Sequence, residues 1–356
     1  MARFTGNNGD PEQSLKPDVT FFLKNDPLVS PGPKDTPFFL GELDSQSTVT
    51  SFLCMELFVE LKSGTHYDPF CDSKDGGMAE RGSENGGNTR GQCILYAANQ
   101  LAYQHRLFAF SLAICKTKVR FFRWDREGAV ISAAIDVSQE PELLIEFLRR
   151  FDQLTAEQRG LDPTASRATS EQTDRFDRAV ARINIESLKL SVGDRGIYPR
   201  YQLEVHGPNN ATSYYIVGKA LDYDTGLVGR CTRGYLALNV STGKCVFLKD
   251  VWRPDVVGVE PEHVWYEKLA EAEVPHLVEF ECASDVISPG NATAPNGGRV
   301  QKGLTHQLKG LLGSDPKSLI RGRVHYRFVQ RELCRPLLEF TNSKELTTVI
   351  LHSLEG

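Results

Sequence analysis

The stretch GLVGRCTRGYLALNVSTGKCVFLKD fills residues 226–250 and decides how the second half of the chain folds. Its features follow one another in chain order: glycines Gly226, Gly229 and Gly234, an apolar run Tyr235–Val240, a turn Ser241–Gly243, a second run Cys245–Leu248, and Lys249. Two apolar runs joined by a short turn that contains glycine predict a β-hairpin. The Glu-rich segment EPEHVWYEKL (260–269) comes next and is predicted to be helical.

This order of features suits phosphate binding. A glycine-rich loop brings backbone N–H groups close to phosphate oxygens, and a strand lysine such as Lys249 adds a point charge for them. A glutamate on the following helix would hold the lysine, with Glu262 as the first choice and Glu267 as the second. The candidate binding residues are therefore Gly226, Gly229, Cys231, Gly234 and Lys249. The alternative is a surface hairpin whose lysine stem covers apolar surface.

Composition limits the class of protein. The chain has 356 residues, enough for two domains of ordinary size, and its 40% hydrophobic content allows globular cores. The net charge of −5 gives no argument for binding to nucleic acid or membranes. No apolar run approaches the roughly 20 residues of a membrane span. The eight cysteines include no C-x-x-C pair, which indicates reduced thiols in a cytoplasmic or nuclear protein.

The pattern of elements predicts an α+β protein in three parts. Residues 1–160 are expected to form an α/β domain with a mixed sheet. Residues 161–195 are polar and predict a helical connector, with the domain boundary at 162–170. Residues 196–356 are expected to form an antiparallel sheet with a helix, interrupted by an inserted loop at 284–320.

Within the first part, strands are predicted at 15–23 and 52–62 and a helix at 91–107. The interval 63–90 is rich in Gly, Asp, Ser and Asn and predicts a flexible insertion. The loop between the first two strands contains prolines at positions 27, 31, 33 and 37. Residues 140–154 (EPELLIEFLRRFDQL) carry apolar residues on one side and predict an amphipathic helix.

A second constellation lies on these two strands. Asp18 ends a Pro-Asp pair, and Glu60 and Lys62 are two residues apart on the next strand, so that their side chains share one face. Gln92 is expected to open the following helix. Carboxylate oxygens suit Mg²⁺, which makes Asp18 and Glu60 candidate metal ligands. The alternative is that Glu60 and Lys62 are solvated charges and that Asp18 caps a turn.

Both halves resemble known families. The arrangement of Asp18, Glu60 and Lys62 is similar to the PD-(D/E)xK nuclease-like fold, in which two carboxylates hold a divalent metal and the lysine positions a water. The glycine loop, strand lysine and helix glutamate have the layout of a protein-kinase small lobe. The chain as a whole resembles the fungal-type protein kinase (FunK) family, through the segments LKPDVTF (15–21), FVELK (58–62), RFFRWDREG (120–128), GLVGRCTRGYLAL (226–238), VFLKDVWR (246–253), RVHYRFVQ (323–330) and RPLLEFTNSKEL (335–346).

The kinase resemblance implies ATP-dependent phosphoryl transfer to Ser or Thr hydroxyls, with Mg²⁺ as the metal and Lys249 and Glu262 as catalytic residues. Two departures stand out. Cys231 occupies the middle glycine position of a G-x-G-x-x-G loop, where its side chain is expected to crowd the phosphates. The 356 residues contain neither H-R-D-x-x-x-x-N nor D-F-G, so that the large lobe is expected to be absent.

The leading interpretation is therefore a kinase-family protein that is a non-catalytic fragment or pseudokinase, without detectable transfer activity of its own. ATP is a possible ligand, the protein substrate is unknown and no membrane partner is expected. Two interpretations from other classes stay open. One is a metal-dependent nuclease-like or nucleic-acid-associated module built on Asp18, Glu60 and Lys62, and the other is an interaction scaffold that uses neither site.

Overall fold

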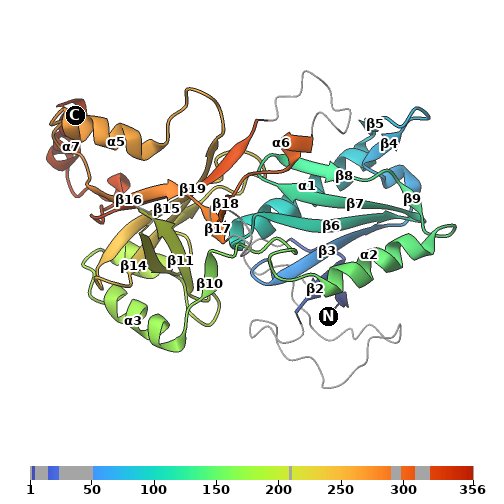
Figure 1. Ribbon diagram of the computed structural model, residues 1–356, viewed down its shortest axis with the longest axis horizontal. Helices are drawn as coiled ribbons and strands as arrows, with labels where there is room; N and C mark the ends of the chain where they lie inside the picture. Colours follow the sequence, from blue (N-terminus) through green and yellow to red (C-terminus); the bar gives the residue numbers. More distant parts are fainter. Residues whose placement is uncertain are drawn as a thin grey trace. The chain divides into compact units, whose positions relative to one another are not determined.

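The computed structural model describes residues 2–4, 15–23, 51–207, 211–289, 298–308 and 321–355. These residues form a mixed α+β protein with seven α-helices and four sheets (Figure 1). The chain divides into two compact units. Unit 1 contains Met1–Asp162, Thr225–Gly229 and Gly303–Ile320, and unit 2 contains Pro163–Asp224, Arg230–Lys302 and Arg321–Gly356. The four prolines of the loop after residue 23 lie outside the described residues.

Unit 1 is built around a mixed sheet with the strand order β1-β2-β3-β6-β7-β8, with β9 also paired to β7. Its strands are β1 (Ala2–Phe4), β2 (Val19–Phe22), β3 (Met55–Lys62), β6 (Phe108–Cys115), β7 (Lys118–Asp125), β8 (Gly128–Ile131) and β9 (Ile135–Asp136). Strands β3 and β6 run parallel, because α1 (Glu84–Tyr103) connects them, and the other described pairs of this sheet are antiparallel.

The two faces of this sheet are covered by different helices. Phe58 on β3 packs with Tyr96 of α1, with ring centroids 5.6 Å apart. Its neighbours Leu57 and Val59 point the other way, into the cluster that contains Phe151 of α2 (Pro141–Gln153). Because side chains alternate along a strand, Glu60 and Lys62 lie on the α1 side with Phe58. A largely apolar strand thus carries Glu60 and Lys62 into the covered face of the sheet.

The interval 63–90, predicted as a flexible insertion, contains regular structure. It holds a 3-10 turn η1 (Thr65–Tyr67), the hairpin strands β4 (Phe70–Asp72) and β5 (Met78–Glu80), and the first turns of α1. The helix begins at Glu84, after an N-cap in which Ser83 Oγ accepts a hydrogen bond from the Gly86 N–H. Gln92 is therefore in mid-helix and does not open it. The polar and glycine-rich first turns carry no apolar period, which is why the pattern placed the start too late.

Unit 2 is built around an antiparallel sheet with the order β10-β11-β12-β14-β15-β19-β16, with β13 also paired to β14. Its strands are β10 (Ala165–Arg167), β11 (Tyr201–His206), β12 (Thr212–Val217), β13 (Asp222–Tyr223), β14 (Arg233–Asn239), β15 (Cys245–Pro254), β16 (Phe280–Asp285) and β19 (Arg323–Gln330). A separate two-stranded sheet pairs β17 (Ile287–Pro289) with β18 (Gly298–Val300). The predicted connector 161–195 contributes β10 to the main sheet, together with two helices.

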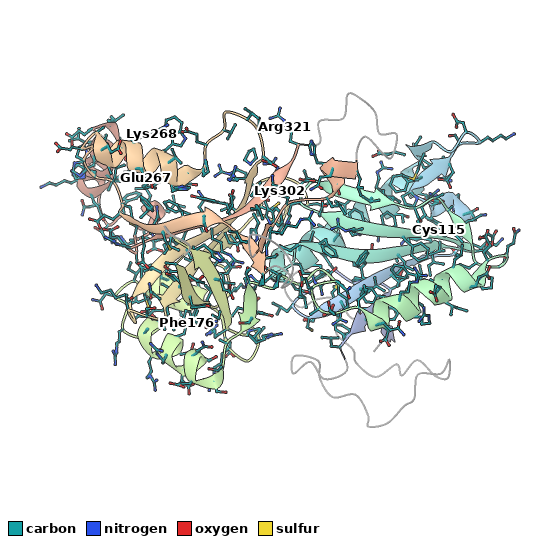
Figure 2. The ribbon with its side chains drawn as sticks, in the orientation of Figure 1. Cys115, Phe176, Glu267, Lys268, Lys302 and Arg321 are labelled. Carbon is teal, nitrogen blue, oxygen red and sulfur yellow. The ribbon has the colours of Figure 1, made fainter. Side chains whose placement is uncertain are left out.

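Helices cover parts of the unit 2 sheet. Its helical segments are α3 (Ser170–Val180), α4 (Glu186–Ser191), α5 (Glu262–Glu271), η3 (Leu337–Glu339) and α7 (Ser343–Glu355), while α6 (Thr305–Leu308) belongs to unit 1. Phe176 of α3 is fully buried against Ile216 and Leu236 of the sheet (Figure 2). Tyr266 of α5 packs on Phe328 of β19, with ring centroids 4.9 Å apart. Among the described residues, no helix combines the length and apolar character needed to cross a membrane.

The glycine-rich stretch 226–250 contributes a hairpin to this sheet. Strands β14 and β15 are antiparallel, with Gly234 opposite Lys249. The turn between them places Gly243 at φ +69°, a left-handed conformation that favours glycine, and the Gly243 N–H donates to the Asn239 carbonyl at 2.9 Å. The second strand continues to Pro254, five residues beyond Lys249, so that Lys249 sits in the middle of β15.

Candidate functional site

The lysine of the hairpin contacts the first helix glutamate. Lys249 Nζ lies 2.6 Å from Glu262 Oε2 and 2.9 Å from Glu262 Oε1. The side chains of Lys249 and Glu262 are 20% and 30% exposed, so that the ion pair is open to solvent on one side. Glu267, the second choice from the sequence, lies on the exposed part of α5 (Figure 2). Of the two candidates, Glu262 is the one paired with Lys249.

The local fold explains this contact. Glu262 is the first residue of α5, where a carboxylate is favoured by the helix dipole. The helix is fixed on the sheet because the His263 N–H donates to the Tyr326 hydroxyl at 3.1 Å, and Gln330 Nε2 donates to the Tyr266 hydroxyl at 3.0 Å. Lys249 shares a strand face with Val251, which packs in the cluster with Tyr266. The strand alternation therefore aims Lys249 at α5.

The glycine-rich loop is divided between the two units. Gly226 and Gly229 belong to unit 1, whereas Cys231 and Gly234 belong to unit 2 together with Lys249. Gly229 has φ +131°. A Cβ at Gly234 would meet the Phe247 ring at 2.9 Å, so that a side chain at this position needs that ring to move.

Cys231 adopts a backbone conformation that favours glycine, with φ +44°. The residue is 1% exposed. Its side chain is thus buried within the protein, which does not fit the expectation that it crowds a bound phosphate. Strain in the backbone is the consequence of placing cysteine here.

A buried charge network lies on the other face of β15. Asp250 is directly opposite Arg233 on β14 and Arg327 on β19, and its Oδ1 accepts from Arg233 Nη2 at 3.2 Å and His325 Nε2 at 2.8 Å. Its Oδ2 accepts from Arg327 Nε at 3.1 Å. Burial opposes the charge of Asp250, but Arg233, His325 and Arg327 hold its pKa well below the usual range.

Sequence reasoning missed this network. Its signal was present in RVHYRFVQ (323–330), where His325 and Arg327 occupy alternate positions of an otherwise apolar strand. An arginine and a histidine on one face of a central strand need buried hydrogen-bond partners. The network is structural, because Asp250 is fully buried, and it fixes β15 between β14 and β19.

In unit 1, the structure brings Asp18, Glu60 and Lys62 together. Asp18 Oδ2 accepts a hydrogen bond from the Leu61 N–H at 2.8 Å, and Lys62 Nζ donates to Glu60 Oε1. The Glu60 side chain is 3% exposed, and its Oε2 has no hydrogen-bond partner among the described residues. Burial is the largest cause that raises the pKa of Glu60 to about 7, Lys62 opposes it, and the nearby Asp18 adds to it.

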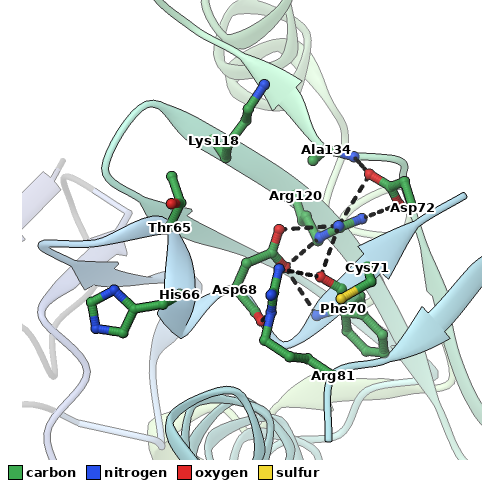
Figure 3. Close-up of a pocket in the computed structure, with 10 residues that line it drawn as sticks. All are labelled: Thr65, His66, Asp68, Phe70, Cys71, Asp72, Arg81, Lys118, Arg120 and Ala134. Carbon is green, nitrogen blue, oxygen red and sulfur yellow. Dashed lines mark hydrogen bonds and ion pairs between the residues drawn. The ribbon is translucent and has the colours of Figure 1, made fainter. Parts of the chain in front are cut away.

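Two other clusters of charged groups are satisfied by the protein itself. A cavity of about 540 Å³ in unit 1 is lined by Arg120, which donates to Asp68 at 2.7 Å and to Asp72 at 2.8 Å (Figure 3). Arg81, also in its wall, donates to the Asp68 carbonyl at 2.7 Å. The arginines of this cavity are thus occupied by protein oxygens and indicate a structural role.

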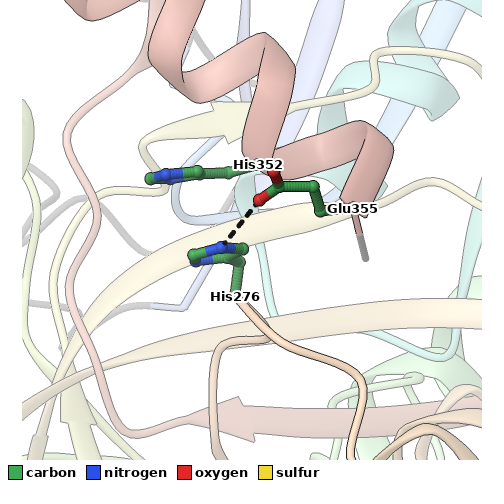
Figure 4. Close-up of side chains that lie close together, drawn as sticks. All are labelled: His276, His352 and Glu355. Atoms are coloured by element: carbon green, nitrogen blue, oxygen red, sulfur yellow. Dashed lines mark ion pairs between the residues drawn. The ribbon is translucent and has the colours of Figure 1, made fainter.

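In unit 2, His276, His352 and Glu355 gather at the end of α7 (Figure 4). The two imidazole rings are stacked, with centroids 3.8 Å apart and planes within 7° of parallel. A metal ligated by two histidines must lie in both ring planes, and parallel planes do not meet. What remains is an exposed contact, in which His276 Nε2 lies 3.3 Å from Glu355 Oε2.

The sequence was compared with known proteins. A family model described as fungal protein kinase matches residues 77–356, which include β14, β15 and α5 and also the part of unit 1 from β5 onward. Asp18, Glu60 and Lys62 precede the matched residues. No curated protein and no solved structure gave a match. Because the model covers well over half of the chain, the chain belongs to the fungal protein kinase family.

Proposed function

We propose that unit 2 is a kinase-type small lobe that binds the phosphates of ATP through Lys249. The observation that carries this proposal is the contact of Lys249 Nζ with both carboxylate oxygens of Glu262. In protein kinases, a strand lysine paired with a helix glutamate positions the nucleotide phosphates.

The residues fit a nucleotide phosphate. An ammonium group has three donors, and two of those on Lys249 are directed at Glu262, which leaves one for a phosphate oxygen. Glu262 fixes the orientation of the ammonium group before a ligand arrives. ATP, when bound, would supply the phosphoryl group. The partial exposure of Lys249 gives a ligand access to the remaining donor.

We further propose that these 356 residues hold a nucleotide without completing phosphoryl transfer. In kinases, the base for the substrate hydroxyl and the Mg²⁺ ligands come from the H-R-D-x-x-x-x-N and D-F-G motifs, and neither occurs in the sequence. A transfer assay is therefore expected to be negative.

The test is nucleotide binding by thermal shift, with and without Mg²⁺, on the full chain. A ligand that binds the folded state raises the melting temperature as it saturates. We expect a shift with wild type, no shift with Lys249→Met and an unchanged shift with Lys244→Met, which removes an exposed lysine from the same hairpin. An equal shift in Lys249→Met would overturn the proposal. Phosphate transfer that depends on Lys249 would overturn the non-catalytic part alone.

A second candidate function is divalent-cation binding in unit 1 by Asp18 and Glu60. The observation that favours it is the buried Glu60 Oε2, which lacks a hydrogen-bond partner among the described residues and lies near the Asp18 carboxylate. A hard cation such as Mg²⁺ would satisfy that oxygen and both negative charges. Lys62, on the same strand face, is placed to orient the Glu60 carboxylate.

Calorimetric titration with Mg²⁺ and Mn²⁺ tests this candidate. Binding to wild type that is lost in Glu60→Ala, but kept in Glu146→Ala on the exposed side of α2, would support the site. Cation-dependent cleavage of DNA that is lost in the same variant would add nuclease chemistry. Equal cation binding by wild type and Glu60→Ala would exclude the site.

A further inference from the structure

The turn between β7 and β8 holds two segments that come from far along the chain. This turn, Asp125-Arg126-Glu127-Gly128, contacts both 225–229 and 303–306, which belong to unit 1 with it. The first of these segments is the N-terminal half of the glycine-rich loop. Within unit 1, the turn is therefore hydrogen-bonded to the N-terminal half of the glycine-rich loop.

Arg126 makes the contact with the loop. It is among the largest fully buried side chains, and its guanidinium donates to the Leu101 carbonyl at 2.7 Å and to the Gly226 carbonyl at 3.1 Å. In return, the Gly229 N–H donates to the Arg126 carbonyl at 3.3 Å. Between the two glycines, Leu227 is 9% exposed and packs in the core cluster on the α1 side of the sheet. Both ends of the segment 226–229 are thus hydrogen-bonded to Arg126, and of its two middle residues Leu227 is buried while Val228 is exposed.

The neighbours of Arg126 hold the second segment. Asp125 Oδ2 accepts from the Leu304 and Thr305 N–H groups, both at 3.0 Å, and Glu127 Oε2 accepts from the His306 N–H at 2.7 Å. The carboxylates of Asp125 and Glu127 thus hold the segment 303–306, and the guanidinium of Arg126 holds the glycine-rich loop. The turn therefore binds the two segments through different side chains.

The loop is also fixed where it returns to unit 2. The Arg230 carbonyl accepts from the Trp252 N–H at 2.8 Å, one residue after Gly229. A chain with Gly226 and Gly229 loses much conformational freedom on ordering. The hydrogen bonds at Gly226, Gly229 and Arg230 order the loop when the protein folds. A ligand therefore does not have to lose binding free energy to the conformational entropy of the loop.

We propose that Arg126 is a positioning residue for the segment 226–229 of the glycine-rich loop, on whose conformation nucleotide binding depends. This inference rests on the nucleotide binding proposed for unit 2. Arg126 itself touches no nucleotide. It acts through the backbone of Gly226 and Gly229.

Hydrogen exchange and nucleotide affinity, measured on the full chain, test the proposal. In Arg126→Ala we expect faster exchange of the amides in 225–234 and nucleotide affinity lower by roughly tenfold. Arg126→Lys, which can still donate to the Gly226 carbonyl, should restore part of both. The matched control is Arg120→Ala, which removes another buried arginine of unit 1 that bonds to Asp68 and Asp72. It should lower the melting temperature but leave loop exchange and affinity unchanged.

Leu227→Ala tests the same proposal if Arg126→Ala does not fold. It weakens the packing of the loop on the core of unit 1 and leaves Arg126 in place. Faster loop exchange and weaker affinity in this variant would support the proposal. Unchanged exchange in both variants would overturn it, and so would an equal effect of Arg120→Ala. If wild type binds no nucleotide, the proposed function of unit 2 fails, whereas the exchange measurement still decides whether Arg126 orders the loop.

Discussion

Each unit contains a lysine paired with a glutamate, and the two pairs differ in how far water reaches them. In unit 1, Lys62 contacts Glu60, whose side chain is 3% exposed. In unit 2, Lys249 contacts Glu262, whose side chain is 30% exposed. The first pair spans two positions of one strand, and the second joins a strand to the start of a helix.

This difference in burial separates two kinds of chemistry. A buried carboxylate loses its hydration, so that the pKa of Glu60 rises and the group becomes sensitive to protons and cations. A partly exposed pair loses little hydration, and its lysine stays accessible to a ligand. The same two residue types thus fit the two proposals, which are cation binding in unit 1 and phosphate binding in unit 2.

The largest effect is expected from Asp250, where burial of charge is complete. Asp250→Asn removes the negative charge from a network with two buried arginines, Arg233 and Arg327. We expect the free energy of unfolding of unit 2 to fall by roughly 3–5 kcal/mol, because uncompensated buried charges are strongly unfavourable. Urea denaturation measures it.

The control is Asp255→Asn, which removes the partner of Lys302 from an ion pair about 40% exposed. It should change the free energy of unfolding by less than about 1 kcal/mol. If the free energy of unfolding falls by similar amounts in Asp250→Asn and Asp255→Asn, burial does not determine how much a carboxylate contributes to the stability of this unit.

The second prediction compares the same substitution in the two pairs. At pH 8, Lys62→Met leaves Glu60 buried without its cation, and should lower the free energy of unfolding by about 3 kcal/mol. Lys249→Met leaves Glu262 partly hydrated, and should cost less than about 1 kcal/mol. Urea denaturation of both variants measures the difference. A larger fall in the free energy of unfolding in Lys249→Met than in Lys62→Met would contradict this prediction.

The sequence predicted the parts of both sites that follow from local pattern. Strand alternation placed Glu60 and Lys62 on one face, and the spacing of the hairpin and helix led to Glu262 as the partner of Lys249. Both inferences need only the period of an element and the order of elements. The family assignment followed from the same ordered segments and is confirmed by the family model.

Long-range packing accounts for what the sequence did not predict. The buried network of Asp250 was not predicted, because its partners on β19 are more than seventy residues away in sequence. Leu227 lies with Val228 between two glycines, and its burial in unit 1 depends on a core assembled from distant segments. In such cases the sequence supplies the residue types, and the tertiary fold decides which of them meet.

The third prediction concerns pH and Glu60. Mainly through burial, the folded-state pKa of Glu60 is raised from 4.5 to about 7. Stabilisation by its protonated form is therefore complete below about pH 4.5 and is lost as the pH rises through 7. Glu60→Gln stays neutral, so that its free energy of unfolding relative to wild type should rise by up to about 3 kcal/mol between pH 4.5 and 8.

Urea denaturation in EDTA, followed by the fluorescence of the buried Trp124 of unit 1, measures this change. Asp18→Asn should reduce the pH dependence, because the Asp18 charge contributes to the raised pKa. If the free energies of unfolding of Glu60→Gln and wild type differ by the same amount at pH 5 and pH 8, burial does not raise the pKa of Glu60.

The smallest effect is expected at Cys231, a buried residue of the glycine-rich loop. Cys231→Gly relieves the positive φ, which is worth about 1 kcal/mol, but increases the freedom of the unfolded chain by a similar amount. The free energy of unfolding should therefore change by less than about 1 kcal/mol. Because the cysteine side chain is buried, nucleotide affinity should change by less than about threefold, as measured by calorimetry. A gain of tenfold or more would mean that the side chain obstructs the phosphates, and that the exposure of Lys249 alone does not define the site.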